Sequence, residues 1–201
     1  MKVLIYPKDE NLLRKSSSPV TKFGESTKTS IKVLKRTIYE HPAAGLAAPQ
    51  VGIHKQIILV RTGMKEDDDY ELSKPIVIVN PKVIEIGSLI RGYDACLSIP
   101  GLYGFTFRPQ YLVVEGLDEK GNTFQRRFDG LDARVVHHEI DHLYGVLFLD
   151  HIKDREHDLF FIVEDRKSGD SYLVPFNAVL SNMKDNLASQ YRLPTSVVHF
   201  G

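Results

Sequence analysis

The sequence has no excess of charge of either sign. Twenty-six Lys and Arg residues balance twenty-six Asp and Glu residues, which leaves a formal net charge of zero. A protein without a net charge has no overall electrostatic field that attracts it to nucleic acid or to an anionic membrane. Basic and aromatic residues do not interleave along any stretch either. We therefore expect no nucleic-acid binding by the domain itself, with a transient ribosome contact left open.

Long hydrophobic runs are missing as well. The longest, such as IILV and IVIV, fall far short of the ~20 apolar residues that cross a bilayer. The N-terminal stretch MKVLIYPKDENLL meets proline and charge too early for a secretory signal, and it is not Arg-rich and acid-poor as organelle presequences are. We expect a cytoplasmic protein with no membrane partner, or an organellar one if the natural chain has lost a presequence.

Cysteine occurs only once, at Cys96. A single cysteine excludes an intramolecular disulfide and is typical of a reducing compartment. Its simplest interpretation is a small buried hydrophobic residue. The flanking sequence DACLSIPG favours a shaped loop over a packed strand, however, because small residues, Pro and Gly surround the thiol.

The periodicity predicts an α+β fold, because several short strands and a few helices do not alternate in βα units. Ile31, Leu34 and Ile38 recur at helical spacing, which predicts a helix over about residues 27–41. The other expected elements are a loop at 45–52, a strand at 55–60, a charged loop at 61–74, two strands joined by a bend within 75–87, and hairpins at 110–130 and 159–176.

A second helix is expected over residues 129–145. Asp129 or Asp132 can cap its first turn, and Gly145 can end it. This helix contains the densest group of chemically active side chains in the sequence, VVHHEIDHLYG.

The spacing within that helix predicts a metal site. His138 and His142 are four residues apart, so they lie one turn apart on one face and can reach one cation. Glu139 borders the same face, where it can act as a general base without coordinating the metal. His137 points away from this face and is a poor third ligand.

Three residues outside the helix are candidates for the third ligand. His151 and His157 follow downstream, where zinc proteases of this kind usually take theirs. Cys96 is the alternative, because a thiolate beside a cation has a depressed pKa and is a good ligand. One thiolate with two imidazoles would leave a position for water, as in a catalytic site.

Three segments together resemble the peptide deformylase family. They are GLAAPQ at 45–50, CLS at 96–98 and HEIDH at 138–142, in the family's order and approximate spacing. Flanking stretches extend the resemblance over residues 1–152, which we interpret as the catalytic domain. Residues 153–201 match poorly. We interpret them as a C-terminal extension of the same domain, a hairpin around Ser168–Gly169 followed by a helix that carries Val179, Met183 and Leu187 at four-residue spacing.

The resemblance implies both a fold and an activity. The fold would be antiparallel β-sheets packed around a central metal-binding helix. One divalent metal ion, iron(II) in the active form or otherwise zinc, nickel or cobalt, would be held by Cys96, His138, His142 and a water. The activity would be removal of the N-formyl group from N-formylmethionyl peptides by metal-hydroxide attack, with Glu139 as general base and then general acid.

The resemblance also assigns further site residues. The side-chain amide of Gln50 and the backbone N–H of Leu97 would stabilise the oxyanion. Gly45 would leave room for the peptide backbone. Arg108 matches an arginine near the rim of the active site and is expected, with Gly45, Asp94 and Ala95, to bind the substrate, although its simpler interpretation is a solvated side chain. Asp141 projects off the ligand face and is expected to anchor the helix.

The sequence departs from the family at four positions near these motifs. Gly is replaced by Ala43, Glu-Gly before the cysteine by Asp94 and Ala95, and Gln before the first histidine by His137. The side chain of Asp94 is shorter than that of the family's Glu, so a hydrogen bond or ion pair made by that Glu would be lengthened or lost. The methyl group of Ala95 would narrow the substrate cleft. We therefore expect hydrolysis with an altered or narrowed substrate range.

Two alternatives stay open. One is a zinc-dependent peptidase or amidase with another substrate, which would use a third ligand such as His151. The other is a catalytically weak paralogue that binds N-terminal peptides, as the departures at Ala43, Asp94 and Ala95 would allow. The oligomeric state is not readable from the sequence.

Overall fold

The computed structural model describes residues 2–41, 43–63, 73–180 and 191–192. The chain forms two units. The first unit comprises Met1–Leu4, Asp9–Ile90 and Arg108–Leu147, and the second comprises Ile5–Lys8, Arg91–Phe107 and Phe148–Gly201.

A five-stranded antiparallel sheet forms most of the first unit. Its strand order is β1-β2-β3-β6-β7, so β2 and β3 lie inside the sheet and β1 is an end strand. The IILV run forms β2 and is fully buried. Its β-branched residues are typical of such an inner strand. The strands are β1 Gly45–Ala47, β2 Ile57–Val60, β3 Ile76–Ile86, β6 Tyr111–Leu117 and β7 Thr123–Asp129.

Two predictions in this sheet were wrong. The segment expected as a loop at 45–52 contains the strand β1 and the 3-10 helix η1 (Ala48–Val51), because Gly45–Ala47 pairs with β2. The expected strand, bend and strand within 75–87 is the single strand β3. Asn80, which has a φ of 52°, and a register shift against β6 absorb the bend within β3.

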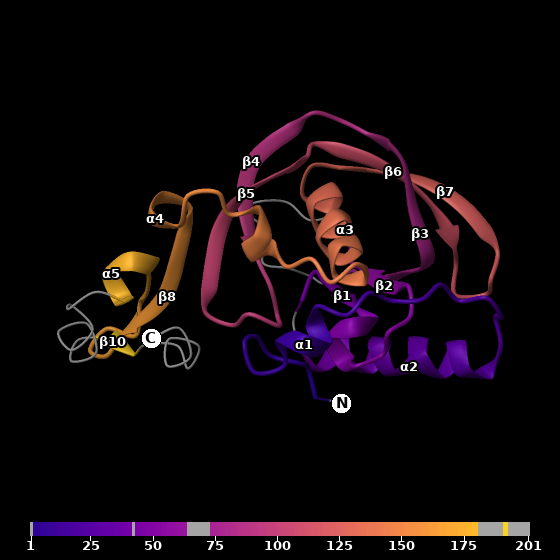
Figure 1. Ribbon diagram of the computed structural model, residues 1–201, viewed down its shortest axis with the longest axis horizontal. Coiled ribbons are helices and arrows are strands. Elements are labelled where there is room, and N and C mark those ends of the chain that lie inside the picture. Colours follow the sequence, from indigo (N-terminus) through magenta and orange to yellow (C-terminus); the bar gives the residue numbers. More distant parts are fainter. Residues whose placement is uncertain (1, 42, 64–72, 181–190, 193–201) are drawn as a thin grey trace. The chain divides into compact units, whose positions relative to one another are not determined.

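The helix α3 (Gly130–Leu143) packs on the sheet of the first unit, against β1, β2, β6 and β7 (Figure 1). It begins and ends close to the predicted bounds, and Gly145 takes a φ of 73° just beyond its end. The predicted side-chain cap is wrong. Asp129 makes no capping hydrogen bond and instead accepts hydrogen bonds from Arg127, whereas Asp132 accepts one from the backbone N–H of Gly63.

The helix predicted over 27–41 is α2 (Glu25–Glu40). Its buried residues include Ile31, Leu34 and Ile38, so the apolar stripe was predicted correctly. A short helix, α1 (Glu10–Leu13), precedes it. Within the described ranges, no helix combines the length and the apolar composition needed to cross a bilayer.

The second unit is built on a sheet of order β10-β8-β5-β4, with β9 added to β8. The predicted hairpin at 159–176 is confirmed as β8 and β9. The last predicted helix begins with α5, but Met183 and Leu187 lie outside the described residues. The elements are β4 Leu89–Ala95, β5 Leu102–Pro109, η2 Phe148–His151, α4 Arg155–Asp158, β8 Leu159–Asp165, β9 Ser171–Pro175, α5 Phe176–Leu180 and β10 Tyr191–Arg192.

These elements confirm the predicted α+β class. The sheets are antiparallel, and α3 is the helix that carries the candidate metal ligands.

Candidate metal centre

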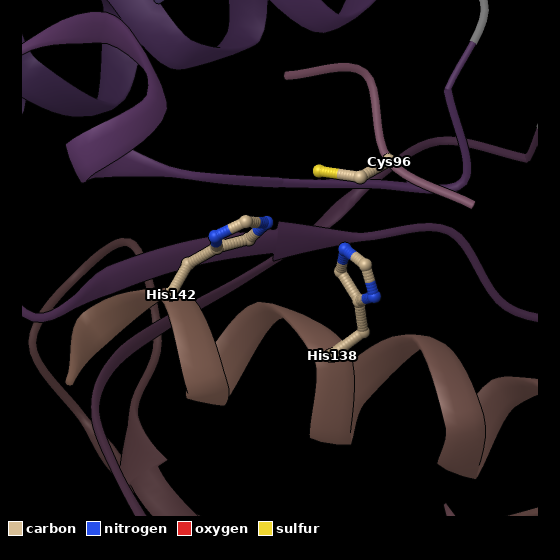
Figure 2. Close-up of side chains that lie close together, drawn as sticks. All are labelled: Cys96, His138 and His142. Atoms are coloured by element: carbon tan, nitrogen blue, oxygen red, sulfur yellow. The ribbon is translucent and has the colours of Figure 1, made fainter. Parts of the chain in front are cut away.

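Three side chains that are potential metal ligands come together in the structure. The ligand atoms of Cys96, His138 and His142 all lie within 4.8 Å of one another, and all three residues are buried. Figure 2 shows the two imidazoles rising from one helix toward the thiol. The structure therefore brings together the ligand set that the sequence motifs predicted.

The helix α3 presents both histidines to the same point. His138 and His142 are one turn apart, and their ring centroids are 4.9 Å apart with an interplanar angle of 78°. Their exposed fractions are only 6% and 1%. Both rings are thus held in packed surroundings, where a ligand has little conformational freedom to lose on binding a metal.

Cys96 follows directly after β4, in the turn that the flanking sequence predicted. The backbone N–H of Ile99 donates to the carbonyl of Cys96 at 2.9 Å, which closes the turn. The N–H of Tyr6 donates to the carbonyl of Ser98 at 2.8 Å and ties the turn to the N-terminal segment. Both contacts fix the backbone on either side of Leu97.

The donor set fits a divalent transition metal. Bonds of about 2.0–2.3 Å place the ligands of one tetrahedral cation within about 4 Å of one another, so the observed cluster needs only a small inward adjustment. A thiolate with two imidazoles suits zinc, iron, nickel or cobalt. Three protein ligands also leave one coordination position, which is the pattern of a catalytic site.

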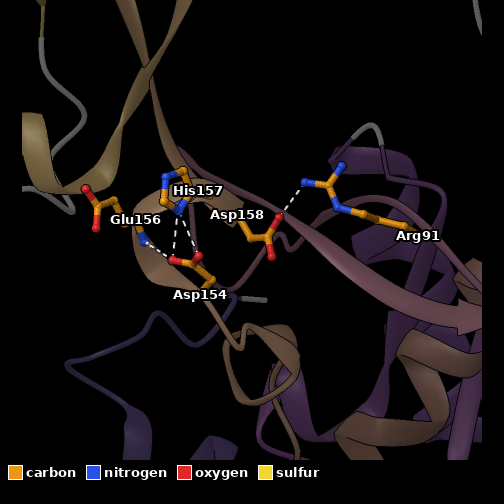
Figure 3. A network of polar contacts seen from close by, with 5 residues as sticks. All are labelled: Arg91, Asp154, Glu156, His157 and Asp158. Atoms are coloured by element: carbon orange, nitrogen blue, oxygen red, sulfur yellow. Dashed lines mark hydrogen bonds and ion pairs between the residues drawn. The ribbon is translucent and has the colours of Figure 1, made fainter.

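The other histidines considered as third ligands lie outside this cluster. Among the described residues, the cluster of three or more potential ligands consists of Cys96, His138 and His142, without His151 or His157. His157 instead pairs with Asp154, whose Oδ2 lies 2.7 Å from the His157 Nδ1 in an exposed network (Figure 3). The structure therefore does not support a site built on His151.

Glu139 is packed against Gly45 of β1. Its exposed fraction is 4%, and a Cβ added at Gly45 would lie 2.5 Å from the Glu139 Oε1. The sequence assigned Gly45 to the peptide backbone of the substrate. The structure adds a different reason for the glycine, because any side chain at this position would displace the glutamate.

Gln50 lies in η1 and is 1% exposed. The backbone N–H of Ala47 donates to its Oε1 at 2.8 Å, and the N–H of Leu4 donates to its carbonyl at 2.8 Å. The Nε2 of the amide is a hydrogen-bond donor. The bond from Ala47 to Oε1 fixes the direction in which this donor points.

Arg108 is fully buried, so the interpretation as a solvated side chain is wrong. Its Nη1 donates to the Oδ2 of Asp141 at 2.7 Å and lies 2.7 Å from the Nδ1 of His137. Its Nη2 lies 3.4 Å from the Nδ1 of His138. The expectation that Asp141 anchors the helix agrees with this ion pair, which ties α3 to the end of β5.

Asp94 finds a partner on the neighbouring strand. Thr106 of β5 donates from its Oγ1 to the Asp94 Oδ2 at 3.0 Å, and both side chains are buried. The sequence analysis did not single out Thr106. Alternation along the strand puts Thr106 on the same face as Leu102 and Gly104, but this pattern does not indicate Asp94 as its partner.

A comparison with known families matches residues 1–158 to the family described as Polypeptide deformylase. Peptide deformylase 2 of Prochlorococcus marinus strain MIT 9313 is 38% identical over 151 residues, which cover 75% of this chain and 73% of that protein. Peptide deformylase 1 of Shewanella oneidensis is 38% identical over 152 residues, covering 76% of this chain and 86% of that protein.

Solved structures agree with these relatives. A peptide deformylase from Synechococcus elongatus in complex with actinonin superposes with a TM-score of 0.68 at 36% identity, covering 77% of this chain and 80% of that chain. A peptide deformylase from Legionella pneumophila gives a TM-score of 0.66 at 35% identity, covering 76% and 85%. With this agreement of sequence, fold and ligand set, the chain belongs to the peptide deformylase family, whose members remove N-formyl groups from nascent peptides.

Proposed function

We propose that this chain removes the formyl group from the N-terminal methionine of newly made polypeptides, with one divalent metal ion held by Cys96, His138 and His142. The observation that supports this most directly is the cluster of Cys96, His138 and His142, whose ligand atoms lie within 4.8 Å of one another, with the buried Glu139 next to His138 in the chain. A general base beside a three-ligand metal site is the arrangement that metal-assisted amide hydrolysis requires.

Glu139 serves as the proton carrier. A bound divalent cation supplies Lewis acidity, which lowers the pKa of a water and polarises a carbonyl. The Glu139 carboxylate accepts the proton of the attacking water and then delivers it to the departing amine. Its burial keeps bulk water from competing for these transfers, and Gly45 leaves the room that the carboxylate occupies.

Gln50 and Leu97 stabilise the negative charge that develops on the formyl oxygen. The bond from Ala47 to the Gln50 Oε1 orients Nε2 as a donor. The N–H of Leu97 lies in the turn that Ile99 closes onto Cys96. Donors fixed before the reaction need no reorganisation, and losing one such donor typically costs about a hundredfold or more in rate.

The substrate contacts are assigned to Gly45, Asp94 and Ala95. Ala95 is exposed at the end of β4, next to the cysteine, where its methyl group shapes the wall that a peptide meets. Asp94 is buried against Thr106 and acts through the position of that wall. Arg108, which matches a family position near the site, acts through Asp141 and the histidine-bearing turn of α3.

The wider assignments rest on the family resemblance. We propose iron(II) as the active metal, with zinc, nickel or cobalt as other occupants that the same donors accept. We also propose that residues 1–152 form the catalytic domain, that residues 153–201 extend it, and that the protein works in the cytoplasm or in an organelle on formylated chains, with transient ribosome contact.

An anaerobic deformylation assay tests this function. Protein loaded with iron(II) should release free amine from formyl-Met-Ala-Ser, and Glu139→Ala loaded in the same way is the control. Turnover no faster than the control would contradict the proposal. Measurable peptide affinity without turnover would identify the peptide-binding paralogue instead.

A further inference from the structure

One stretch of the surface is unusually rich in aliphatic side chains. Among the described residues, eleven large hydrophobic side chains are exposed, and four of them fall within residues 84–90. This stretch runs from the end of β3 into the start of β4 (Figure 1). We call the four side chains, whose exposed fractions are 42–59%, the aliphatic edge: Ile84, Ile86, Leu89 and Ile90.

The aliphatic edge lies along an open side of two strands. β2 accompanies β3 only over Ile76–Val79, whereas β6 continues along the other side of β3 as far as Ile86. β4 is the end strand of its own sheet. Within the part of the chain that the structure describes, no strand therefore pairs with this side of residues 84–90. Such an edge presents a row of backbone donors and acceptors that a further strand can bind.

A different strand edge in the first unit is protected against pairing. β7 is also an end strand, and its exposed residues include Arg126, Arg127 and Asp129. Charges along an edge oppose association with another chain. Residues 84–90 contain no Pro, Lys or Arg and have a single charge, at Glu85. The chain thus protects one edge and leaves the other apolar, which is the pattern of an interface.

Contacts within the first unit fix the aliphatic edge before a partner binds. The backbone N–H of Gly87 donates to the carbonyl of Tyr111 at 2.9 Å, and the Tyr111 hydroxyl donates to Glu85 at 3.0 Å. Arg134 of α3 donates to the carbonyl of Ile90 at 3.1 Å. An edge that is already ordered loses little conformational entropy on pairing, so more of the contact energy appears as affinity.

The charges around the aliphatic edge suit a second copy of this chain. Glu85 and Arg91 lie three residues to either side of Ser88, and both are exposed. In an antiparallel pairing about Ser88, Glu85 of each copy comes toward Arg91 of the other. Arg91 also pairs with Asp158 in its own chain, but its side chain remains 47% exposed. The net charge of zero adds no repulsion between copies.

From these observations we propose that two copies of the chain form a dimer through the aliphatic edge, by antiparallel strand pairing of residues 84–91 about a twofold axis near Ser88. The same surface is used by both copies, so the contact is closed and stops at two chains. The paired residues end before Ala95 and Cys96, and the dimer does not depend on the deformylase activity.

Sedimentation of the full, metal-loaded chain across the micromolar range tests the dimer. The mass of the wild type should rise from one chain toward two. Leu89→Lys should raise the dissociation constant about tenfold or more, because it removes an apolar contact on each side of the axis. Leu12→Lys is the matched control, since Leu12 is 45% exposed but lies in α1, and it should leave the dissociation constant unchanged. A monomer at every concentration, or equal effects of the two variants, would overturn the proposal.

Exchanging the charges tests the antiparallel geometry. Glu85→Arg alone and Arg91→Glu alone should each weaken the dimer, because each variant brings like charges together on both sides of the axis. An equimolar mixture of the two variants should dimerise again, because both contacts then join opposite charges. A mixture that stays monomeric, while each variant binds metal as the wild type does, would reject this pairing.

A cross-link locates the axis independently of the charges. Residue 88 should meet its own copy, so Ser88→Cys with added oxidised glutathione should form a disulfide between two chains. Ser26→Cys places an equally exposed thiol on α2 as the control and should not link chains. Equal cross-linking of the two variants would contradict an axis near Ser88.

Discussion

The Cα of Gly45 faces the carboxylate of Glu139 so closely that a methyl group there would lie 2.5 Å from Oε1 and 2.6 Å from Cγ. Gly45 is in an extended strand, and its φ is not positive, so the backbone conformation does not require a glycine here. The glycine is required for space, because the general base fills the volume that a side chain would take.

Substituting Gly45→Ala should therefore reduce activity by displacing the base. A shift of about 1 Å in a catalytic group costs on the order of a hundredfold in rate, so we expect kcat to fall by about that factor with metal content unchanged. Gly24→Ala is a matched control, because its φ is −124° and a Cβ there meets nothing within 4 Å. Equal activity of the two variants would reject this account of Gly45.

Substituting Cys96→Ser should remove most of the bound metal. A hydroxyl is a much poorer ligand than a thiolate for zinc or iron, whereas His151→Ala removes a residue outside the ligand cluster. After dialysis against a chelator, we expect metal near one per chain in the wild type and in His151→Ala, and far less in Cys96→Ser. The reverse pattern would favour a peptidase-like site that uses His151.

The ion pair between Arg108 and Asp141 should be important for stability. Arg108 is fully buried, so Arg108→Met leaves a largely buried carboxylate without its cation, a loss of about 3–5 kcal/mol in the free energy of unfolding. Urea denaturation of the metal-loaded protein measures this loss. The double variant with Asp141→Leu should recover part of it.

An exposed pair provides the comparison for Arg108. Lys28 contacts Glu25 at 2.9 Å, but both side chains are mostly in solvent. Lys28→Met should change the free energy of unfolding by less than about 1 kcal/mol. If Arg108→Met is as mild as Lys28→Met, the buried pair does not anchor α3.

Asp154 and His157 should move each other's pKa in opposite directions. The hydrogen bond with Asp154 raises the pKa of His157, and the same bond lowers the pKa of Asp154. The stabilisation from His157 is complete below its ordinary pKa and is lost as pH rises through the raised value. The stabilisation from Asp154 is complete above its ordinary pKa and is lost as pH falls through the lowered value.

An NMR titration of the His157 ring protons checks the direction of this shift. In Asp154→Asn the pKa of His157 should fall toward about 6.5, its ordinary value. Glu156→Gln is the control, because Glu156 contributes less to the shift than Asp154 does. An unchanged pKa in Asp154→Asn would show that the pair in Figure 3 does not persist in solution.

Local periodicity predicted the helices better than it predicted the strands. The stripe of Ile31, Leu34 and Ile38 placed α2 within two residues, because helix contacts are local. The segment at 45–52 was expected as a loop, since Gly and Pro dominate its local preferences. Its first residues form β1 because β2, a separate segment, offers them a partner.

The partners of buried polar residues were also beyond the sequence. Arg108 could be solvated or buried until its contact with Asp141 was known, and nothing local to Asp94 indicated Thr106 as its donor. Both contacts cross between elements that are separate in sequence, and burial depends on how those elements pack.

The sequence by itself determined that His138 and His142 share a face with Glu139 beside them, because a helix fixes the geometry of residues one turn apart through its own hydrogen bonds. Only the tertiary structure decided that the thiol of Cys96 joins them while His151 does not. That choice depends on the path of the chain between separate strands and the helix, and no short-range rule sets this path.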